Sequence, residues 1–409
     1  MLSSCNEEAR HQITSIKMAT NSDVFFARTK SDSKRRFVVV IPVVFLFLLF
    51  ACLWSLHDLG AKRNETQRRN VLIYAPARSG SSFLGQVFNQ HQDAFYIYEP
   101  LYMYTILDKL RVKTPSQLKH DSLTLLRDCF RCNFTNHELY LYFISHPGFA
   151  STLFRDSSKA MSSPPLCQPR EDKSKISSRH IEEQGACTNR LEPMKTSAVC
   201  RRHKQVAVKI LSDRMMLEEI FKQFSNSGNF KIIHLIRDPR AIVASRQRLG
   251  WISKSSDTLA KIREFCNRMN DNFKFATNTS SEFSKNYMLL RYEDLVANIF
   301  SAVRKVFKAT GLNMTEHVKS WLLENTRWSG TVDNSEPFRT TRRDALKQAN
   351  LWRSTIAMNT VRAVEDNCKL VMKKAGYKTI KNQKYLRNTT LSLLARPTKT
   401  LKQFLVVKY

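Results

Sequence analysis

The chain has 409 residues, with 66 Lys and Arg against 35 Asp and Glu, and therefore a formal net charge of +31 at pH 7. Hydrophobic residues make up 42% of it, with only 10 Gly and 12 Pro. This composition excludes a disordered, collagen-like or low-complexity chain, and the length suits about two domains of roughly 150 residues each. The basicity predicts a polyanionic partner, which could be nucleic acid, anionic lipid or an acidic carbohydrate.

Residues 37–56 read FVVVIPVVFLFLLFACLWSL, twenty positions without a charge, which is about the length that crosses a bilayer core. They exceed the roughly 7–15 apolar residues of a cleaved signal and precede no small-residue cleavage pattern, so we predict a retained signal-anchor. The basic run 34–36 before the span places the N-terminus in the cytosol. We therefore expect a single-pass type II membrane protein with a cytosolic tail (1–36), a transmembrane helix (37–56), a short stem (57–69) and a lumenal remainder.

All the Asn-X-Ser/Thr glycosylation sequons follow the predicted span, as expected of a lumenal domain: Asn64, Asn133, Asn278, Asn313 and Asn388. Seven of the nine cysteines also follow it, which favours an oxidising compartment: Cys129, Cys132, Cys167, Cys187, Cys200, Cys266 and Cys368. Seven is odd, so one thiol is free or intermolecular. No second CxxC or histidine pair follows Cys129 and Cys132 at ligand spacing, so we favour disulfides over a metal site and expect no metal. Nucleic acid is not an expected partner in such a lumen, and anionic glycans remain.

Apolar runs rich in strand-forming residues alternate with helical stretches from residue 70 onward. The candidate strands are residues 71–75, 94–98, 206–210, 231–236 and 287–290. This alternation predicts an α/β fold in which helices flank a parallel sheet. We assign one lumenal domain to residues 70–385 and a C-terminal tail to 386–409. Residues 112–204, with five cysteines, interrupt the alternation and are interpreted as a disulfide-pinned insertion.

A loop rich in Ser and Gly joins the first strand to the first helix, and it reads Arg78-Ser79-Gly80-Ser81-Ser82. Such a loop presents backbone N–H groups and a helix N-terminus to an anion. It lacks the Gly-Lys-Ser/Thr ending of a Walker A loop, which argues against a kinase or an ATP-hydrolysing enzyme but not against phosphosulfate binding. The alternative is an ordinary N-capped helix.

A second candidate anion site follows the fourth strand. Asp238 is a good helix N-cap and Pro239 a good first helical residue, so Arg237 ends the strand and Ser245 lies two turns into the helix. Arg237 and Ser245, eight residues apart, could therefore hold one phosphate from two sides.

Four motifs now stand in order over residues 70–380: RSGSSF, FYIYEPLY, LIRDPRAIVASR and LLRYEDL. Together they resemble the Golgi carbohydrate 6-O-sulfotransferases of Gal, GalNAc or GlcNAc. FNQH and FYIYEPLY are most similar to the keratan sulfate galactose and chondroitin 6-O-sulfotransferases. The resemblance implies a P-loop-like, PAPS-dependent (3′-phosphoadenylyl sulfate) sulfotransferase fold in the Golgi membrane. These relatives commonly have a His shortly after EPLY, whereas Met103 follows Tyr102 here.

The same resemblance assigns residues to the donor. The loop residues would bind the 5′-phosphosulfate: Arg78, Ser79, Gly80, Ser81, Ser82 and Phe83. Arg237 and Ser245 would bind the 3′-phosphate, and Arg342 and the Trp352-Arg353 pair resemble a late segment near the nucleotide. RYEDL at 291–295 is instead interpreted as a structural lock at a strand end.

Sulfuryl transfer requires a base for the sugar hydroxyl and positive charge on the sulfuryl oxygens and the departing phosphate. Glu99 is the candidate base, because it follows the second strand at the ligand-binding edge of a parallel sheet. A glutamate in that context serves as base in related glycan sulfotransferases, although a structural Glu–Arg pair is the alternative. His91 is a second candidate base. Lys209 ends the third strand, and it and Arg78 are the candidate catalytic cations.

The leading hypothesis is a Golgi enzyme that moves the sulfuryl group of PAPS, by in-line displacement, to a C6 hydroxyl of Gal or N-acetylhexosamine. Its partner would be an anionic keratan- or chondroitin-type glycan, and the sequence leaves a homodimer open. Two alternatives remain at this point. One is a lumenal glycan kinase, and the other is a non-enzymatic membrane protein that binds anionic glycans.

Overall fold

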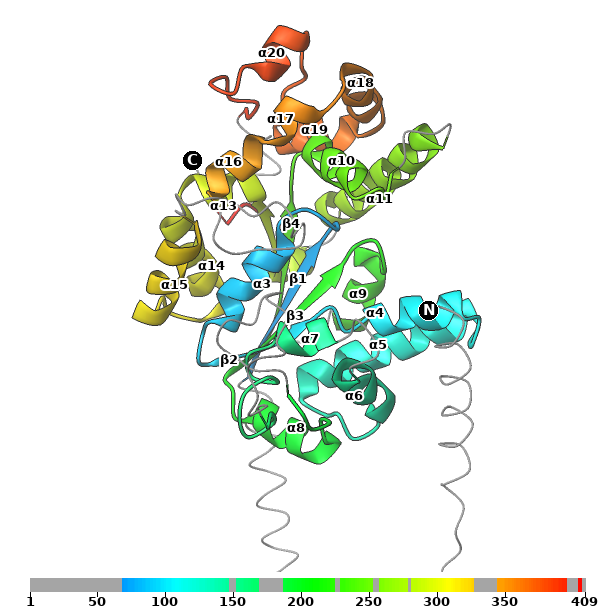
Figure 1. Cartoon of the computed structure of the whole chain (residues 1–409), viewed down its shortest axis with the longest axis vertical. Helices are drawn as coiled ribbons and strands as arrows, with labels where there is room; N and C mark the ends of the chain where they lie inside the picture. The colour runs from blue at the N-terminus through cyan, green and yellow to red at the C-terminus, as the bar shows by residue number, and fades with distance from the viewer. Residues whose placement is uncertain are drawn as a thin grey trace, which may run out of the picture. The chain divides into compact units, whose positions relative to one another are not determined.

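The computed structural model describes residues 68–146, 152–168, 187–224, 229–252, 257–278, 281–326, 344–395 and 404–406 (Figure 1). The predicted tail and membrane span, most of the predicted stem, Asn64 and Arg342 lie outside these described residues. Within them, no helix is both long enough and apolar enough to cross a membrane.

The core element is a five-stranded sheet, which confirms the predicted parallel α/β architecture. Its strands are β1 (Arg69–Ala75), β2 (Ala94–Tyr98), β3 (Gln205–Leu211), β4 (Phe230–Ile236) and β5 (Tyr287–Arg291). They pair in the order β2-β3-β1-β4-β5, and every pair is parallel. All carboxyl ends therefore lie at one edge. The order changes direction at β1, and ligands of open α/β sheets bind outside the carboxyl ends at such a switch point.

Helices supply the connections between strands. They are α3 (Ser81–Asn89), α4 (Tyr102–Lys109), α5 (Pro115–Arg131), α6 (Glu138–Ser145), α7 (Thr152–Asp156), α8 (Pro193–Arg201), α9 (Leu217–Phe224), α10 (Pro239–Arg248), α11 (Thr258–Asn278), α12 (Ser281–Asn286), α13 (Tyr292–Ala297), α14 (Ile299–Thr310), α15 (Glu316–Thr326), α16 (Ala345–Asn350), α17 (Trp352–Thr355), α18 (Met358–Asn367), α19 (Lys369–Ala375) and α20 (Gln383–Arg387).

Both faces of the sheet are covered, which explains why its strands are continuous apolar runs. On one face, Val71 and Ile73 of β1 pack into a core with residues of α3, α13 and α14. On the other face, the hydroxyl of Tyr74 donates to the backbone oxygen of Met215 and to Asn272 of α11, both at 2.9 Å. Neighbouring residues of the central strand thus point to opposite helical layers.

Three disulfides stabilise the described part of the chain, and they join Cys132 to Cys200, Cys167 to Cys187, and Cys266 to Cys368. The thiol of Cys129 is free and buried. The odd cysteine count predicted one unpaired thiol, and this prediction is confirmed. Two of the disulfides lie inside residues 112–204, in the segment that carries α5 to α8.

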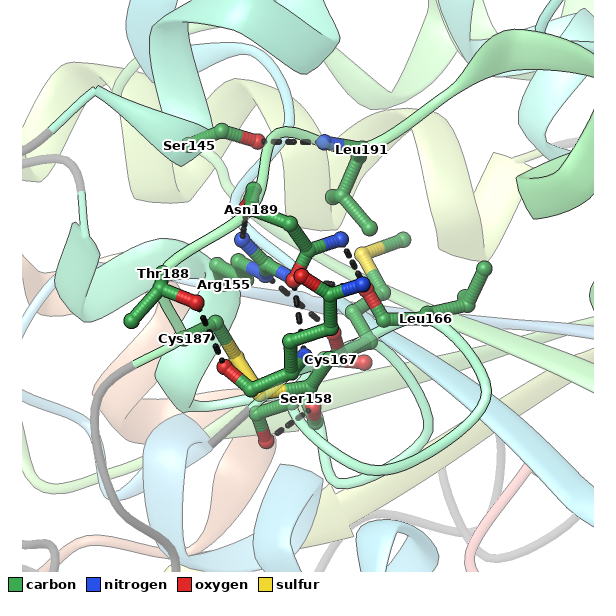
Figure 2. The surroundings of a disulfide bond; sticks show 12 residues. Ser145, Arg155, Ser158, Leu166, Cys167, Cys187, Thr188, Asn189 and Leu191 are labelled. Atoms are coloured by element: carbon green, nitrogen blue, oxygen red, sulfur yellow. Dashed lines mark hydrogen bonds between the residues drawn. A yellow bond between two sulfur atoms is a disulfide. The ribbon is translucent and has the colours of Figure 1, made fainter. Parts of the chain in front are cut away.

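Figure 2 shows the Cys167–Cys187 disulfide, which joins the two described segments 158–168 and 187–191. Arg155 of α7 also links these segments, since its Nη2 donates to the backbone oxygen of Leu166 at 2.9 Å and its Nη1 to that of Asn189 at 2.5 Å. The first segment contacts the sheet, because the Ser158 hydroxyl donates to the backbone oxygen of Tyr96 in strand β2.

Candidate active site

The loop between β1 and α3 adopts an unusual backbone conformation. Arg78 and Gly80 have φ values of 76° and 94°. Gly80 is the N-cap of α3, and no side-chain hydrogen bond caps this helix. Ser81, Ser82 and Phe83 lie in the first helical turn, where backbone N–H groups have no intrahelical partner. Such a helix start has the free N–H groups that a bound anion would use.

Gly80 is also required by the side chain that packs on it. A Cβ atom at this position would lie 2.4 Å from Cδ2 of Tyr292, the first residue of α13. The guanidinium carbon of Arg237 lies 4.6 Å from the centroid of the same ring. Tyr292 thus connects the β1 loop to the end of β4, and a larger residue at 80 would separate them.

The two predicted phosphate-binding segments meet in space. Nε of Arg78 donates to the Ser245 hydroxyl at 3.1 Å, and Nη1 of Arg237 donates to the backbone oxygen of Arg78 at 3.3 Å. The local prediction for α10 is confirmed, because Asp238 caps this helix by accepting from the backbone N–H of Arg240 at 3.0 Å. Arg78, Arg237 and Ser245 therefore form one basic, hydroxyl-bearing cluster.

Two polar atoms of this region are buried without a hydrogen-bond partner among the described residues: Oγ of Ser79 and Nε of Arg237. A buried polar group left unpaired costs about 1–3 kcal/mol. An anion held at the loop would satisfy such donors. The orphaned atoms and the glycine-shaped loop therefore fit a phosphosulfate-bearing molecule.

The loop is held in place by an ion pair beneath it. Oδ2 of Asp213 accepts from the backbone N–H of Ala77 at 2.7 Å, and Oδ1 of Asp213 pairs with Nη2 of Arg246, also at 2.7 Å. Arg246 in turn donates to the backbone oxygen of Ala77 at 3.2 Å. Both backbone polar groups of Ala77 are thus fixed. Our sequence reasoning missed Asp213 and Arg246.

Glu99 lies directly after β2, 8% exposed, and its φ of 43° is rare for a residue with a side chain. Such strain costs on the order of 1–3 kcal/mol and is concentrated at functional sites. Its Oε1 accepts from Nζ of Lys209, which also donates to the Ser82 hydroxyl at 3.1 Å and lies 4.3 Å from the ring centroid of Tyr98. Lys209, the candidate cation, therefore contacts both the candidate base Glu99 and Ser82 of the loop between β1 and α3.

The charge of Glu99 is set by opposing effects. Burial raises the pKa of this carboxyl, but the charges and hydrogen bonds of Lys209 and Arg214 outweigh burial and hold the pKa below its ordinary value. Glu99 is therefore ionised at neutral pH and able to accept a proton. The structural ion pair and the catalytic base, the two interpretations weighed from the sequence, are compatible in this geometry.

A sequence profile described as the sulfotransferase domain matches residues 68–376 of the chain. Carbohydrate sulfotransferase 5 of Mus musculus is 30% identical over 347 residues, which cover 80% of this chain and 85% of that protein. The chain belongs to the carbohydrate sulfotransferase family. The resemblance inferred from the four motifs is thereby confirmed, and the protein is a sulfotransferase.

Other relatives are similar to this sulfotransferase over the same span. Carbohydrate sulfotransferase 6 of Homo sapiens is 30% identical over 349 residues, covering 80% of this chain and 85% of its own. Carbohydrate sulfotransferase 1 of Danio rerio is 29% identical over 363 residues, which cover 82% of this chain and 84% of that protein. Among solved structures, the sulfotransferase domain of the Synechococcus PCC 7002 olefin synthase is 16% identical, covers 73% of this chain and 94% of its own, and has a TM-score of 0.38. The family assignment does not depend on that structure.

Membership of the sulfotransferase family implies PAPS as the sulfate donor. Within the residues that the structure describes, no group of three or more His, Cys, Asp or Glu side chains could hold a metal ion.

Arg214 is a further residue of the site that our sequence reasoning missed. Its Nη2 pairs with Oε2 of Glu99 at 3.3 Å, its Nη1 donates to the hydroxyl of Thr105, and its guanidinium carbon lies 4.7 Å from the ring centroid of Tyr102. Its place just after the carboxyl end of β3 was the available signal, since charged residues there face the ligand edge of a parallel sheet.

His91 does not share the site with Glu99. His91 precedes β2 whereas Glu99 follows it, so the two residues lie at opposite ends of this strand. Nδ1 of His91 accepts from the backbone N–H of Asp93 at 3.1 Å, so Nε2 donates to the backbone oxygen of Asn313 at 3.0 Å. Burial lowers the pKa of this imidazole. The alternative assignment of His91 as base is therefore wrong.

The RYEDL segment forms the structural lock expected of it. Arg291 makes two bonds to the Asp294 carboxylate, at 2.6 and 2.9 Å, and donates to the backbone oxygen of Ala375 at 2.7 Å. Glu293 accepts from the backbone N–H of Asp238 and from the hydroxyl of Tyr377, both at 2.9 Å. The motif thus ties β5 to the start of α10 and to the C-terminal helices.

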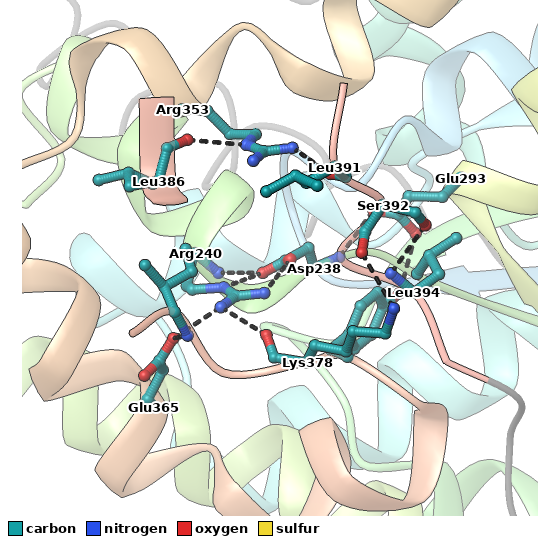
Figure 3. Close-up of polar contacts among 12 residues, drawn as sticks. Asp238, Arg240, Glu293, Arg353, Glu365, Lys378, Leu386, Leu391, Ser392 and Leu394 are labelled. Atoms are coloured by element: carbon teal, nitrogen blue, oxygen red, sulfur yellow. Dashed lines mark hydrogen bonds and ion pairs between the residues drawn. The ribbon is translucent and has the colours of Figure 1, made fainter. Parts of the chain in front are cut away.

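Arg353, which the resemblance placed near the nucleotide, has a structural environment instead. Figure 3 shows its guanidinium among backbone oxygens of the C-terminal segment. It is 1% exposed and donates to the oxygens of Leu386, Leu391 and Tyr385 at 2.9, 2.8 and 3.0 Å. All three of its guanidinium nitrogens thus donate to backbone oxygens, so Arg353 holds α20 and the chain that follows it.

The described sequons lie at or near the surface. Asn278, Asn313 and Asn388 are exposed and Asn133 is half-buried. In two of them the sequon forms a local turn, because the side-chain oxygen of the Asn accepts from the Thr two residues later, at 2.6 Å for both Asn133 and Asn388. These positions are compatible with the predicted glycosylation.

Proposed function

We propose that this sulfotransferase moves the sulfuryl group of PAPS to the C6 hydroxyl of a Gal or N-acetylhexosamine residue in a keratan- or chondroitin-type glycan. The observation that carries this proposal is the contact chain from Glu99 through Lys209 to Ser82. It places a buried carboxylate, a cation and an anion-binding helix start within reach of one another, as in-line transfer between donor and hydroxyl requires.

The donor would be held by the two segments that meet at Arg78. The residues from Arg78 to Phe83 would bind the 5′-phosphosulfate through the N-terminus of α3, and Arg237 and Ser245 would bind the 3′-phosphate. Support comes from the Arg78–Ser245 bond at 3.1 Å and from the orphaned donors of Ser79 and Arg237. PAPS supplies the activated sulfuryl group, and the chain supplies position and charge.

The proton and the charge can be followed through the step. The oxygen of the C6 hydroxyl forms a bond to sulfur, and Glu99 accepts the hydroxyl proton. The bond between sulfur and the phosphate oxygen of the donor breaks at the same time. Negative charge then develops on the departing phosphate, where Arg78 and the N–H groups of α3 would stabilise it. Lys209 would neutralise the sulfuryl oxygens, because it already contacts both Glu99 and the loop.

Membership of a sulfotransferase family makes both alternatives from the sequence unnecessary. A non-enzymatic glycan-binding protein has no use for the strained Glu99, and a kinase loop would end in Gly-Lys-Ser/Thr. The acceptor class is supported by the net charge of +31, which suits an anionic glycan.

The proposed location is the Golgi membrane, with a type II topology and a lumenal catalytic domain. Three disulfides support an oxidising compartment. The relatives named above are carbohydrate sulfotransferases, and the apolar run 37–56 would supply the anchor.

The full-length protein in detergent should be incubated with sulfur-labelled PAPS and, separately, keratan, chondroitin and N-acetylglucosamine-terminated acceptors. We expect label at C6 of one acceptor class. Glu99→Gln should lower kcat by about 10²–10⁴-fold, the usual contribution of a general base, while PAPS binding stays close to wild type. Near-normal turnover of Glu99→Gln would contradict the assignment of the base. Label on none of the acceptors would contradict the acceptor class.

A further inference from the structure

Two tyrosines of strand β2 have different environments. Tyr96 and Tyr98 are two residues apart, so their side chains point to the same face of the sheet, and their ring centroids lie 6.5 Å apart. Tyr96 is fully buried, and a Cβ atom on Gly85 of α3 would clash with its hydroxyl. Tyr98 ends the strand and is half-buried. Of the two tyrosines, Tyr98 is therefore the one at the ligand edge of the sheet.

The hydroxyl of Tyr98 reaches the loop between β1 and α3. Its oxygen lies 3.4 Å from Oγ of Ser82, in the first turn of α3. Pairs of hydroxyl groups normally lie about 2.7–2.8 Å apart, so this hydrogen bond is weak. Among the described residues, Ser82 supplies the one hydrogen bond of this hydroxyl. Tyr98 can therefore turn its hydroxyl to a ligand oxygen without losing a strong partner.

Lys209 contacts the same two side chains. Its Nζ donates to the Ser82 hydroxyl at 3.1 Å and lies 4.3 Å from the ring centroid of Tyr98. An ammonium group and two hydroxyl groups therefore converge on the start of α3, beside the backbone N–H groups that have no intrahelical partner.

We propose that the hydroxyl of Tyr98 binds the sulfuryl group of PAPS beside Lys209, and that Tyr98 is a further catalytic residue of the transfer. The inference deepens the proposed function and rests on the donor site assigned there. The phenol donates a hydrogen bond to one sulfuryl oxygen. No covalent bond to Tyr98 forms or breaks, and its proton stays on the phenol oxygen.

A neutral donor suits this position better than another cation. Glu99 already pairs with Lys209 and Arg214, and a third positive charge would lower the pKa of its carboxyl further and weaken the base. A hydroxyl group stabilises negative charge on the sulfuryl oxygens without adding a charge beside Glu99. Lys209 and Glu99 are 1% and 8% exposed, and a hydrogen bond in such a shielded place is stronger than in water.

The competing interpretation is that Tyr98 only covers Lys209 with its ring, a cation–π contact without a role in the reaction. Tyr98→Phe distinguishes the two interpretations, because it keeps the ring over the ammonium group and removes the hydroxyl.

The test measures nucleotide binding to the full-length protein by calorimetry. Adenosine 3′,5′-bisphosphate differs from PAPS in lacking the sulfuryl group. In Tyr98→Phe, the Kd for PAPS should rise about tenfold, which equals about 1.4 kcal/mol and is close to the contribution of one hydrogen bond to a charged group. The Kd for adenosine 3′,5′-bisphosphate should stay at the wild-type value.

Turnover provides a second measurement. With PAPS saturating and a labelled acceptor class in hand, Tyr98→Phe should lower kcat about 10²-fold, the usual effect of removing one donor that stabilises developing charge. The KM for the acceptor should not change, because the hydroxyl contacts the sulfuryl group and not the sugar.

Tyr96→Phe is the matched control. It removes the same atom from the same face of the same strand, but the hydroxyl of Tyr96 has no hydrogen-bond partner among the described residues. Both Kd values and kcat should therefore equal those of wild type. Melting temperatures of both variants check that they fold.

Specific outcomes overturn the inference. An unchanged Kd for PAPS in Tyr98→Phe leaves only the contact of the ring with Lys209. An equal rise of Kd for the two nucleotides would mean that the hydroxyl binds a phosphate that both carry. If no acceptor is labelled, the proposed acceptor class fails separately, and the two Kd values, which need no acceptor, still decide the role of Tyr98.

Discussion

Two arginines at the same turn have opposite environments. Arg240 is fully buried and pairs with Asp238 at 2.7 Å and Glu365 at 2.6 Å, and it also donates to the backbone oxygen of Lys378 at 2.9 Å (Figure 3). Within the described residues, Arg237, three residues earlier, donates to backbone oxygens alone and keeps a buried, unpartnered Nε. Every guanidinium nitrogen of Arg240 donates to a fixed partner, so this arginine holds the fold. An arginine such as Arg237, with an unpartnered nitrogen, can hold a ligand.

The largest expected effect comes from replacing Arg240, the buried arginine that forms ion pairs. Arg240→Met leaves two buried carboxylates, Asp238 and Glu365, without their cation. Removing one partner of a buried ion pair costs about 3–5 kcal/mol, and we expect a loss of that size in the free energy of unfolding measured in urea.

The matched variant is Arg237→Met at the same turn. It strands no carboxylate of an ion pair and removes two hydrogen bonds to backbone oxygens. The unfolding free energy should therefore fall by about 1–2 kcal/mol, less than for Arg240→Met, since such a bond contributes about 0.5–1.5 kcal/mol. Equal destabilisation by the two variants would show that the contrast between these arginines is wrong.

Arg237→Met should instead weaken donor binding. We expect the Kd for adenosine 3′,5′-bisphosphate, measured by calorimetry, to rise about 10–100-fold, which corresponds to the loss of one charge-assisted contact. Adenosine 5′-phosphate lacks the 3′-phosphate, and its Kd should not change. The same loss for both nucleotides would mean that Arg237 does not bind the 3′-phosphate.

The comparison also shows what could be predicted from the sequence. All five strands could be found because strands of a parallel sheet are buried on both faces and form continuous apolar runs. The contacts of Arg78 with Ser245 and of Lys209 with Glu99 could be expected in the same way, since parallel carboxyl ends meet at one edge.

Contacts between distant segments could not be predicted in this way. Nothing in the local sequence shows that Arg353 faces backbone oxygens of a segment more than thirty residues later. The same applies to Asp213, which braces a loop 136 residues earlier. Cys129 is another case, because spacing leaves open which of seven thiols remains free until the fold brings the others together.

The smallest expected effect concerns Arg214, the second cation that pairs with Glu99. Lys209 and Arg214 together hold the pKa of this carboxyl below its ordinary value, and a base works only while it is ionised. Arg214→Gln removes one cation and should raise this pKa. The acid limb of the kcat/KM profile, which reports the free enzyme, should therefore move to higher pH, so that activity falls earlier as the solution is acidified.

Arg214→Lys keeps the positive charge and should restore the wild-type pH profile, which distinguishes an electrostatic role from packing against Tyr102. Thr105→Val removes the other hydrogen-bond partner of Arg214 and should move the acid limb in the same direction by a smaller amount. If the acid limb of Arg214→Gln coincides with that of wild type, Lys209 alone sets the charge of Glu99. The contact of Arg214 with the carboxylate at 3.3 Å would then serve only to orient it.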